Sequence, residues 1–387
     1  MSEPGVTTLE HLLAAKEIVI TCGSGGVGKT SVAAALGTMA AAHLGGRVLV
    51  LTVDPARRLA SALGLEAVGN LETPVPPEAF TAAGVRARGE LWVAMLDTKQ
   101  SWDDLVRRHA PDEKTRDAIL ANPLYTNITA KFVQSHDYIA MERLFEIHSS
   151  GRYDLVVVDT PPTRNALDFL DAPARMAEFF SSRLLRWLTV PYRSRFVTVA
   201  SKPFYTVADR ILGTKFLEDI AEFFSLFQTM ERGFVSRAKE VTRVLADRRT
   251  TFAVITTLEA SPLHEAEFFM QALQARKLQL GALVLNKVLP SYLRDDGATD
   301  AAELLRSAGS ELAVELAPLV SAPEARVAGV LAEVAASFDN FRVVAQREAE
   351  QRAELSVAPE VTVAVPYLDA DIHDLGGLLQ LGERLWR

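Results

Sequence analysis

The sequence contains almost no cysteine: Cys22 is the only one in 387 residues. A single thiol cannot form an internal disulfide, and alone it cannot build a cysteine-rich zinc, iron–sulfur or thiolate metal site. The sequence also lacks any run approaching about 18 consecutive apolar residues, and residues 1–16 have neither the positive nor the apolar region of a secretion signal. These absences predict a cytoplasmic protein without a membrane-spanning helix or a disulfide framework.

An excess of positive charge is missing as well. The 41 Lys and Arg residues are outnumbered by 49 Asp and Glu residues, which gives a formal net charge of −8. This balance disfavours nucleic-acid binding through overall charge, so no nucleic-acid partner is expected. Hydrophobic residues make up 49% of the chain and charged residues 23%, which is typical of globular proteins and excludes global disorder.

Seven short apolar runs rich in β-branched residues predict buried strands. Segments with helical spacing, such as 29–43 and 139–148, separate most of them. Strands that alternate with helices form mainly parallel, helix-covered sheets, so the predicted fold class is α/β. The runs are Glu17–Thr21, Arg47–Val53, Leu91–Leu96, Tyr153–Val158, Thr251–Thr257, Gly281–Leu285 and Val361–Val365.

Three further segments are distinguished by composition. The proline-containing stretch Val68–Glu90 and the stretch Pro290–Asp300, which contains Asp and Gly, are predicted to be exposed loops. Residues Ala301–Leu355 are rich in Ala, Glu and Arg. They predict amphipathic helices that form a solvated outer layer with one apolar face.

The segment Arg164–Thr250 is rich in phenylalanine. It holds 10 of the 18 Phe residues of the chain, and its 15 basic residues outnumber its 10 acidic residues. We predict a helical subdomain at 164–250, inserted into a core made by residues 1–163 and 251–387. Two interpretations of its aromatic side chains remain open: an ordinary subdomain core, or an apolar groove for a hydrophobic client.

The most specific motif is the loop Gly23-Ser24-Gly25-Gly26-Val27-Gly28-Lys29-Thr30, a full G-x-x-x-x-G-K-[ST] placed between a predicted strand and a predicted helix. Glycines let the backbone curl so that successive N–H groups point at a phosphate, and the helix N-terminus adds a favourable dipole. Lys29 is expected to reach the β- and γ-phosphate oxygens, and Thr30 to hold Mg²⁺. The core is therefore predicted to be a P-loop NTPase core that binds a nucleoside phosphate and Mg²⁺. Its predicted ligands in this loop are Gly23, Ser24, Gly25, Gly26, Val27, Gly28, Lys29, Thr30 and Ser31.

Two carboxylates follow predicted strands. Asp54 comes after the run Arg47–Val53, and Asp159 comes after Tyr153–Val158. The carboxyl ends of parallel strands meet at one edge of the sheet, which is also the edge of the glycine-rich loop. Asp159 is expected to anchor Mg²⁺ through a coordinated water, and Asp54 to orient or activate the attacking water. The alternative for each residue is a helix N-cap or a turn carboxylate.

Two more residues follow predicted strands at this edge. Asn286 comes after Gly281–Leu285, and its amide can pair with an adenine edge through a donor and an acceptor. A role as a turn residue is equally compatible with its position. Pro366, after Val361–Val365, is a weaker candidate for nucleotide contact.

These motifs, in this order, resemble the family of arsenite-pump ATPases and tail-anchored-protein-targeting ATPases, within the MinD-like group of deviant phosphate-loop proteins. The matching segments are the loop at 23–30, Asp54-Pro55-Ala56-Arg57, 159–165 (DTPPTRN) and Asn286, while 122–147 resembles the bacterial branch labelled anion-transporting ATPase. The resemblance implies that Asp54 positions the hydrolytic water, that Asp159 supports Mg²⁺ and that Asn286 contacts adenine. It also implies a dimer with ATP at the interface, whose opening and closing follow the γ-phosphate.

The sequence departs from this family at functional positions. The signature lysine of the family, which reaches the partner's nucleotide, is Ser24, and arginines stand at Arg57 and Arg164, where one of them is a candidate replacement. The leading hypothesis is a Mg-ATPase that couples hydrolysis in a dimer to binding of a hydrophobic or membrane-protein client. The alternative is a weakly hydrolysing switch that pairs with a paralogous ATPase. Cys22 alone cannot supply the thiolates of an arsenite sensor or a zinc clasp.

The C-terminal segment Leu378–Arg387 (LLQLGERLWR) allows one further hypothesis. An amphipathic helix at this position is compatible with transient membrane association, as in partition or division-positioning ATPases. A helix packed on the sheet explains the same pattern.

Overall fold

The computed structural model describes residues 8–53, 60, 62–63, 65, 69–125, 133–160, 166–181, 222–357, 359–368 and 371–386. The candidate site residues Asp54, Arg57 and Arg164 lie outside the described residues. So does the middle of the Phe-rich segment, from 182 to 221.

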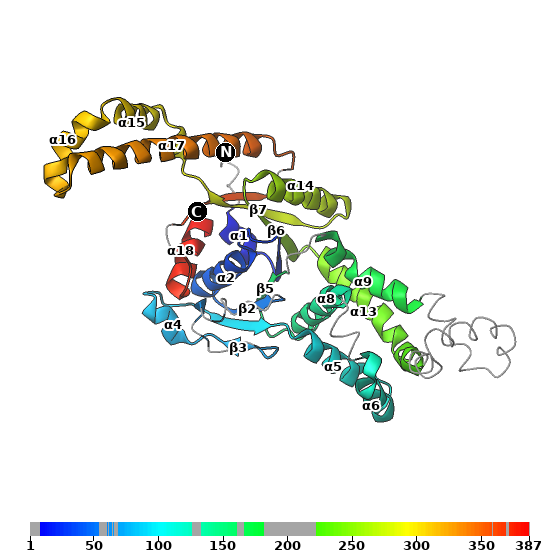
Figure 1. Ribbon diagram of the computed structural model, residues 1–387. Helices are drawn as coiled ribbons and strands as arrows, with labels where there is room; N and C mark the ends of the chain where they lie inside the picture. Colours follow the sequence, from blue (N-terminus) through cyan, green and yellow to red (C-terminus); the bar gives the residue numbers. More distant parts are fainter. Residues whose placement is uncertain are drawn as a thin grey trace, which may run out of the picture.

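One mixed sheet forms the centre of the molecule (Figure 1). Its eight strands lie in the order β3-β4-β2-β5-β1-β6-β7-β8, and all neighbours pair in parallel except β3 with β4. The seven predicted strands and the α/β class are confirmed. The strands are β1 (Ile18–Cys22), β2 (Arg47–Thr52), β3 (Thr73–Pro74), β4 (Glu90–Met95), β5 (Leu155–Asp159), β6 (Thr250–Thr256), β7 (Leu280–Val288) and β8 (Val361–Pro366).

Both faces of the sheet are covered, which explains why its strands are apolar without alternation. Every residue of β1 and β5 is buried. Along β1, Ile18 and Ile20 belong to one hydrophobic cluster and Val19 to the other. Because successive side chains of a strand point to opposite faces, a strand between two helical layers needs apolar residues at every position.

The first layer includes three helices that pack together. These are α1 (Leu9–Ala14), α2 (Lys29–Met39) and α18 (Leu375–Trp386). In α18, Leu378 and Leu385 are buried, and Gly382 lies so close to Met39 of α2 that an added Cβ would be 2.2 Å from Met39 Cγ. The apolar side of the C-terminal segment therefore packs against α2, which agrees with the packing interpretation of that segment and leaves its buried leucines inaccessible to a bilayer.

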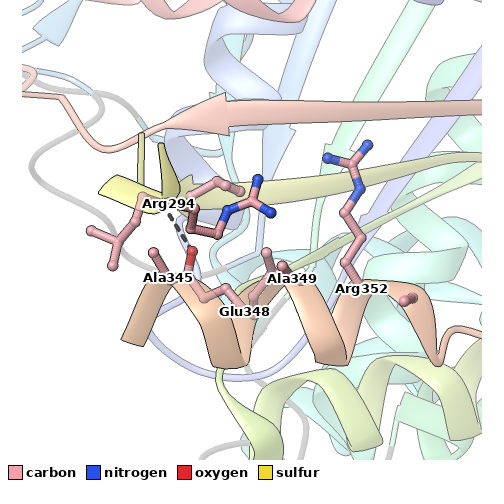
Figure 2. Close-up of a pocket in the computed structure, with 9 residues that line it drawn as sticks. Arg294, Ala345, Glu348, Ala349 and Arg352 are labelled. Carbon is pink, nitrogen blue, oxygen red and sulfur yellow. Dashed lines mark hydrogen bonds between the residues drawn. The ribbon is translucent and has the colours of Figure 1, made fainter. Parts of the chain in front are cut away.

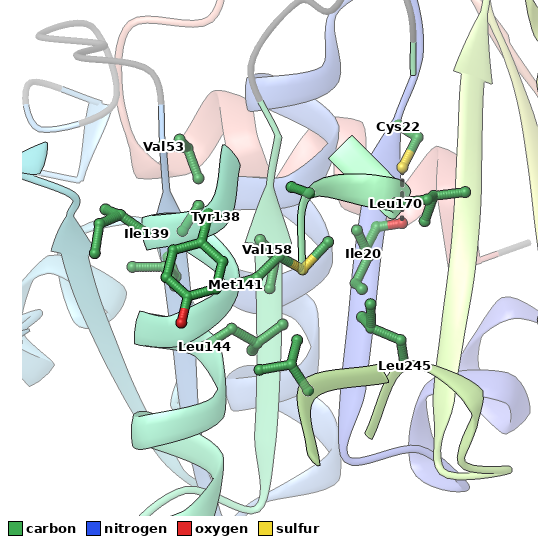
Figure 3. Close-up of a cluster of buried hydrophobic side chains, with 14 of the residues drawn as sticks. Ile20, Cys22, Val53, Tyr138, Ile139, Met141, Leu144, Val158, Leu170 and Leu245 are labelled. Carbon is green, nitrogen blue, oxygen red and sulfur yellow. Dashed lines mark hydrogen bonds between the residues drawn. The ribbon is translucent and has the colours of Figure 1, made fainter. Parts of the chain in front are cut away.

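The second layer holds the larger hydrophobic cluster (Figure 3). Its helices cover the opposite face of the sheet, and Tyr138, Met141 and Leu144 on one of them point toward the strands. The helices are α5 (Thr98–His109), α6 (Glu113–Ala121), α8 (Val133–Ser149), α9 (Ala166–Ser181), α13 (Glu231–Ala246) and α14 (Ala260–Ala275).

Three phenylalanines of the Phe-rich segment belong to this second layer. Phe223, Phe227 and Phe234 are buried, and the rings of Phe227 and Phe234 lie 6.5 Å and 6.2 Å from that of Trp102. For these residues the interpretation as ordinary core is correct. Whether the remaining aromatic residues line a groove stays a prediction.

The stretch predicted as an exposed loop at Val68–Glu90 is partly structured, which corrects that expectation. It contains β3 and the short helix α4 (Pro77–Ala82), and Val75 and Phe80 are buried. Their apolar side chains hold the segment on the body despite its prolines. Likewise, the stretch Pro290–Asp300 contains a 3₁₀-helix at Ser291–Arg294 and the first residues of α15.

The helices predicted for 301–355 are present, but they do not form an outer layer on the sheet. α15 (Asp296–Ser307), α16 (Gly309–Val320) and α17 (Glu324–Ala353) form a helical arm that projects from the body (Figure 1). Of the large hydrophobic side chains that are exposed among the described residues, most lie on this arm. They are Leu304, Val314, Leu319, Val320, Val330, Val334, Phe341, Val343 and Val344. No helix in the described parts of the chain has the length and apolar content needed to span a bilayer.

Candidate functional site

The glycine-rich loop lies between β1 and α2, as the motif predicts. Gly28 is the residue before α2 and adopts φ 96°, and Gly26 adopts φ 81°, so both occupy the left-handed region that favours glycine. A Cβ at Gly23 would lie 2.1 Å from the carbonyl oxygen of Ile255 on β6. The loop therefore passes directly against the next strand and requires glycine for both conformation and space.

Lys29 reaches back across the loop that precedes it. Its Nζ donates a hydrogen bond to the carbonyl oxygen of Ser24 over 2.8 Å, and the residue is only 6% exposed. The ammonium is thus held by the backbone of the loop, at the N-terminus of α2. A cation and a helix N-terminus together form a strong anion-binding site.

A buried carboxylate links three elements beside this loop. Asp159, at the end of β5, is fully buried, and its Oδ2 accepts hydrogen bonds from Thr30 Oγ1 (2.7 Å) and Thr52 Oγ1 (2.9 Å). The neighbouring positions of β2, β5 and β1 in the sheet bring these residues together. The structure therefore places Asp159 next to Thr30, as predicted.

The chemistry of this oxygen set fits Mg²⁺. A threonine hydroxyl and a carboxylate are the hard oxygen ligands that Mg²⁺ prefers, with the remaining positions taken by water and phosphate. Thr30 and Asp159 are the residues that would hold the ion. Among the described residues there is no cluster of three His, Cys, Asp or Glu side chains arranged to hold a metal without a nucleotide.

Asn286 lies against the glycine-rich loop. Its Nδ2 donates to the carbonyl oxygen of Val27 over 2.8 Å, and its Oδ1 accepts from the backbone N–H of Lys287 over 3.0 Å. A turn-stabilising role is therefore present, and contact with adenine stays a prediction. Lys287, a residue with no role predicted from sequence, also contacts the loop: its Nζ donates to Gly26 O over 3.0 Å.

Pro366 reaches the same edge of the sheet. It pairs with Val288 in the β7–β8 register, and the N–H of Tyr367 donates to Val288 O over 3.0 Å. Pro366 is the last residue of β8, and Asn286 lies two residues before the end of the neighbouring β7. Its contact with a nucleotide stays a prediction.

A pocket of about 380 Å³ opens beside the ends of β6 and β7 (Figure 2). Arg294 and Arg352 line it, together with Glu348 of α17. Glu348 Oε2 accepts from the N–H of Leu289 over 2.9 Å, and burial is the largest cause of a raised pKa of this carboxyl. This bond ties the helical arm to the strand end that carries Asn286.

Cys22 is the last residue of β1, immediately before the loop. The residue is 3% exposed, and burial raises the pKa of its thiol to about 12. A thiol in this state is a structural core residue and not a nucleophile or a metal ligand.

Known proteins resemble this chain in sequence. A family model for anion-transporting ATPases matches residues 16–304. The chain is 25% identical to an ATPase ASNA1 homolog of Entamoeba dispar over 297 residues, which cover 75% of this chain and 82% of the relative. It is 23% identical to ATPase BagA of Mycobacterium tuberculosis over 375 residues (95% and 91%), and 24% identical to a putative arsenical pump-driving ATPase 2 of Aquifex aeolicus over 276 residues (71% and 81%). With the family match spanning most of the sheet and the entire phosphate loop, the chain belongs to the anion-transporting ATPase family.

Proposed function

We propose that this protein is a cytoplasmic Mg-dependent ATPase. The observation that carries the proposal is the arrangement of Lys29, Thr30 and Asp159 around the loop that joins β1 to α2. It combines an anion-binding loop with hard oxygen ligands beside it, which is what cleavage of the β–γ phosphoanhydride requires.

In the proposed mechanism, the N–H groups of the loop and the ammonium of Lys29 bind the β- and γ-phosphates. Thr30 would hold Mg²⁺, and Asp159 would support it through a water. The ion, when bound, neutralises charge that develops on the phosphate oxygens. Asp54 orients the attacking water.

We further propose that two protomers bind ATP at their interface, and that the cycle controls binding of a hydrophobic or membrane-protein client. The apolar side chains exposed on the helical arm support a client of this kind, because large apolar patches on a monomer mark interaction sites. The bond between Leu289 and Glu348 supports coupling of the arm to the nucleotide edge.

Ser24 favours a second candidate function. It stands where the family resemblance implies a lysine that reaches the partner's nucleotide. The second candidate is a weakly hydrolysing ATP switch that needs a paralogous subunit to supply the missing charge.

Two experiments test these proposals. The first measures phosphate release in the presence of Mg²⁺ by wild type, Lys29→Ala and Asp54→Asn. The second measures the oligomeric state of wild type by light scattering in ADP, in ATP and without nucleotide. The ATPase proposal expects steady turnover by wild type, a loss of at least about 100-fold in each variant, and a dimer with ATP. If wild type hydrolyses ATP no faster than Asp54→Asn but still binds it, the ATPase proposal is wrong and the weakly hydrolysing switch is supported. If wild type binds no nucleotide, both proposals are wrong.

A further inference from the structure

Two consecutive side chains at the end of β7 hold two consecutive carbonyls of the phosphate loop. Asn286 Nδ2 donates to Val27 O (2.8 Å) and Lys287 Nζ donates to Gly26 O (3.0 Å). β7 and β1 are separated by β6, so both side chains reach across a strand to make these bonds.

The two bonds act on the backbone orientation that anion binding requires. A loop binds phosphate when its successive N–H groups point inward, which turns its carbonyls outward. A donor on the outer side of each carbonyl opposes rotation of the peptide plane. The packing is close as well, because a Cβ at Gly28 would lie 2.4 Å from Asn286 Nδ2.

Lys287 makes its bond from an unfavourable backbone conformation. Its φ is 59°, in the left-handed region where a residue with a Cβ is strained and glycine is not. Strained residues of this kind persist where surrounding structure holds them, and they concentrate at functional sites. A glycine would remove the strain but would also remove the ammonium that holds Gly26.

Lys287 also adds charge where the loop is open to ligand. The residue is exposed, as are Gly25 and Gly26 at the crest of the loop. With Lys29 it gives the loop a second cation, and its ammonium has three donors, of which Gly26 O takes one. The added positive charge and the remaining donors both favour binding of a nucleoside di- or triphosphate to the loop.

We propose that Lys287 is a nucleotide-positioning residue, which holds the crest of the phosphate loop in its anion-binding conformation. The proposal rests on the proposed function, because it assumes that the loop binds nucleotide. It assigns a role in affinity, and no step of hydrolysis passes through Lys287.

The chain offers a matched control for the strain. Lys277, after α14, is also an exposed lysine with a left-handed backbone, at φ 57°, and it lies outside the loop. Lys287→Gly and Lys277→Gly each remove one lysine and one strained conformation. Only the first removes the bond to Gly26.

The experiment measures the dissociation constant of a fluorescent ATP analogue and of ADP, and the Tm without nucleotide, on the full chain. We expect Lys287→Gly and Lys287→Met to weaken binding about tenfold, Lys287→Arg to stay within about threefold of wild type, and Lys277→Gly to bind like wild type. Both glycine variants should have an equal or higher Tm.

The outcomes separate this inference from the proposed function. Wild-type affinity in Lys287→Gly and Lys287→Met would overturn the positioning role while leaving the proposed function intact. Equal weakening in Lys277→Gly would also overturn it, since the effect would then be one of general charge. Failure of wild type itself to bind either nucleotide would instead reject the proposed function.

Discussion

The hydroxyl of Thr30 lies 2.7 Å from Oδ2 of Asp159, so the first turn of α2 is tied to the carboxyl end of β5. The same oxygen accepts a second hydroxyl, that of Thr52 on β2, over 2.9 Å. The carboxylate is fully buried. Burial of an ionised carboxylate is costly unless several donors surround it, and these two hydroxyls supply part of that stabilisation.

Asp159→Asn should abolish Mg-dependent hydrolysis while retaining nucleotide binding. The neutral amide keeps an oxygen that can accept from Thr30, but it loses the charge that attracts Mg²⁺. We expect kcat to fall by about 100-fold or more, and ADP affinity in EDTA to stay within about threefold of wild type. Phosphate release and calorimetric titration with and without Mg²⁺ measure the two effects.

Thr52→Val is the matched control for that change. It removes a donor to the same oxygen without touching the phosphate loop. We expect a fall in kcat of less than about tenfold, because the bond from Thr30 to the same carboxylate oxygen remains. Equal losses in Asp159→Asn and Thr52→Val would contradict a specific role of the carboxylate in metal binding.

Cys22 should be inert toward thiol reagents in the folded protein. Its pKa is raised to about 12 by burial, so at pH 8 only about one thiol in ten thousand is ionised, and the residue is 3% exposed. Labelling with a maleimide or a disulfide reagent should be slow in buffer and complete within minutes in denaturant. Rapid stoichiometric labelling under native conditions, with full ATPase activity, would show that the thiol is accessible.

Glu142 and Arg237 should stabilise the second helical layer only as a pair. Glu142 is 6% exposed, its Oε1 is ion-paired with Arg237, and Tyr138 donates to its Oε2 over 3.0 Å. Burial is the largest cause of the raised pKa of this carboxyl. Because removal of one partner leaves a buried charge, Arg237→Met should lower the free energy of unfolding by about 3 kcal/mol.

The double variant Glu142→Gln, Arg237→Met is the control for this pair. It leaves no unpaired charge and should recover more than half of the loss, as measured by urea unfolding of all three variants and wild type. If the double variant instead loses as much free energy of unfolding as Glu142→Gln and Arg237→Met lose together, the two side chains act independently.

The ion pair between Asp247 and Arg249 should give a pH-dependent contribution to stability. The hydrogen bond from Arg249 lowers the pKa of Asp247 from 3.8 to about 2. A carboxyl whose pKa is lower in the folded state stabilises the fold above its unfolded pKa, and that contribution is lost as the pH falls through the folded pKa. The difference in urea midpoint between wild type and Asp247→Asn should therefore be small but constant above pH 5 and vanish near pH 2. A difference that grows below pH 4 would contradict the assignment.

The strands could be predicted because their sequences reflect burial on two faces. In β5, Leu155–Val158 are apolar at every position, and this pattern can be recognised without knowledge of the neighbouring strands. β3 could not be predicted, since it has only two residues, one of them Pro74, and is defined by pairing with β4. That the helical arm projects from the body could not be predicted either, because an amphipathic pattern does not show which surface covers the apolar face of a helix.

Part of the candidate site could likewise be predicted from sequence, and part could not. The phosphate loop is contiguous in sequence, and Asp159 lies at the end of a strand. Because the carboxyl ends of parallel strands meet at one edge of the sheet, both can be placed there from sequence alone. Lys287 contacts Gly26 across a separation of 261 residues, and that contact depends on the strand order β1-β6-β7. No local pattern of residues distinguishes this lysine from any other exposed lysine.

Two glycines of the phosphate loop should respond differently to alanine. A Cβ at Gly23 would lie 2.1 Å from the backbone oxygen of Ile255, whereas a Cβ at Gly26 would meet nothing within 4 Å. Gly26→Ala adds only the strain of a left-handed alanine, about 1 kcal/mol in the free energy of unfolding. Gly23→Ala must in addition displace β1 from β6, so we expect a loss of at least about 3 kcal/mol or no folded protein. Thermal and urea unfolding compare the two. Equal stabilities would mean that the loop can move away from β6 at little cost, and that its position against that strand is not what fixes its shape.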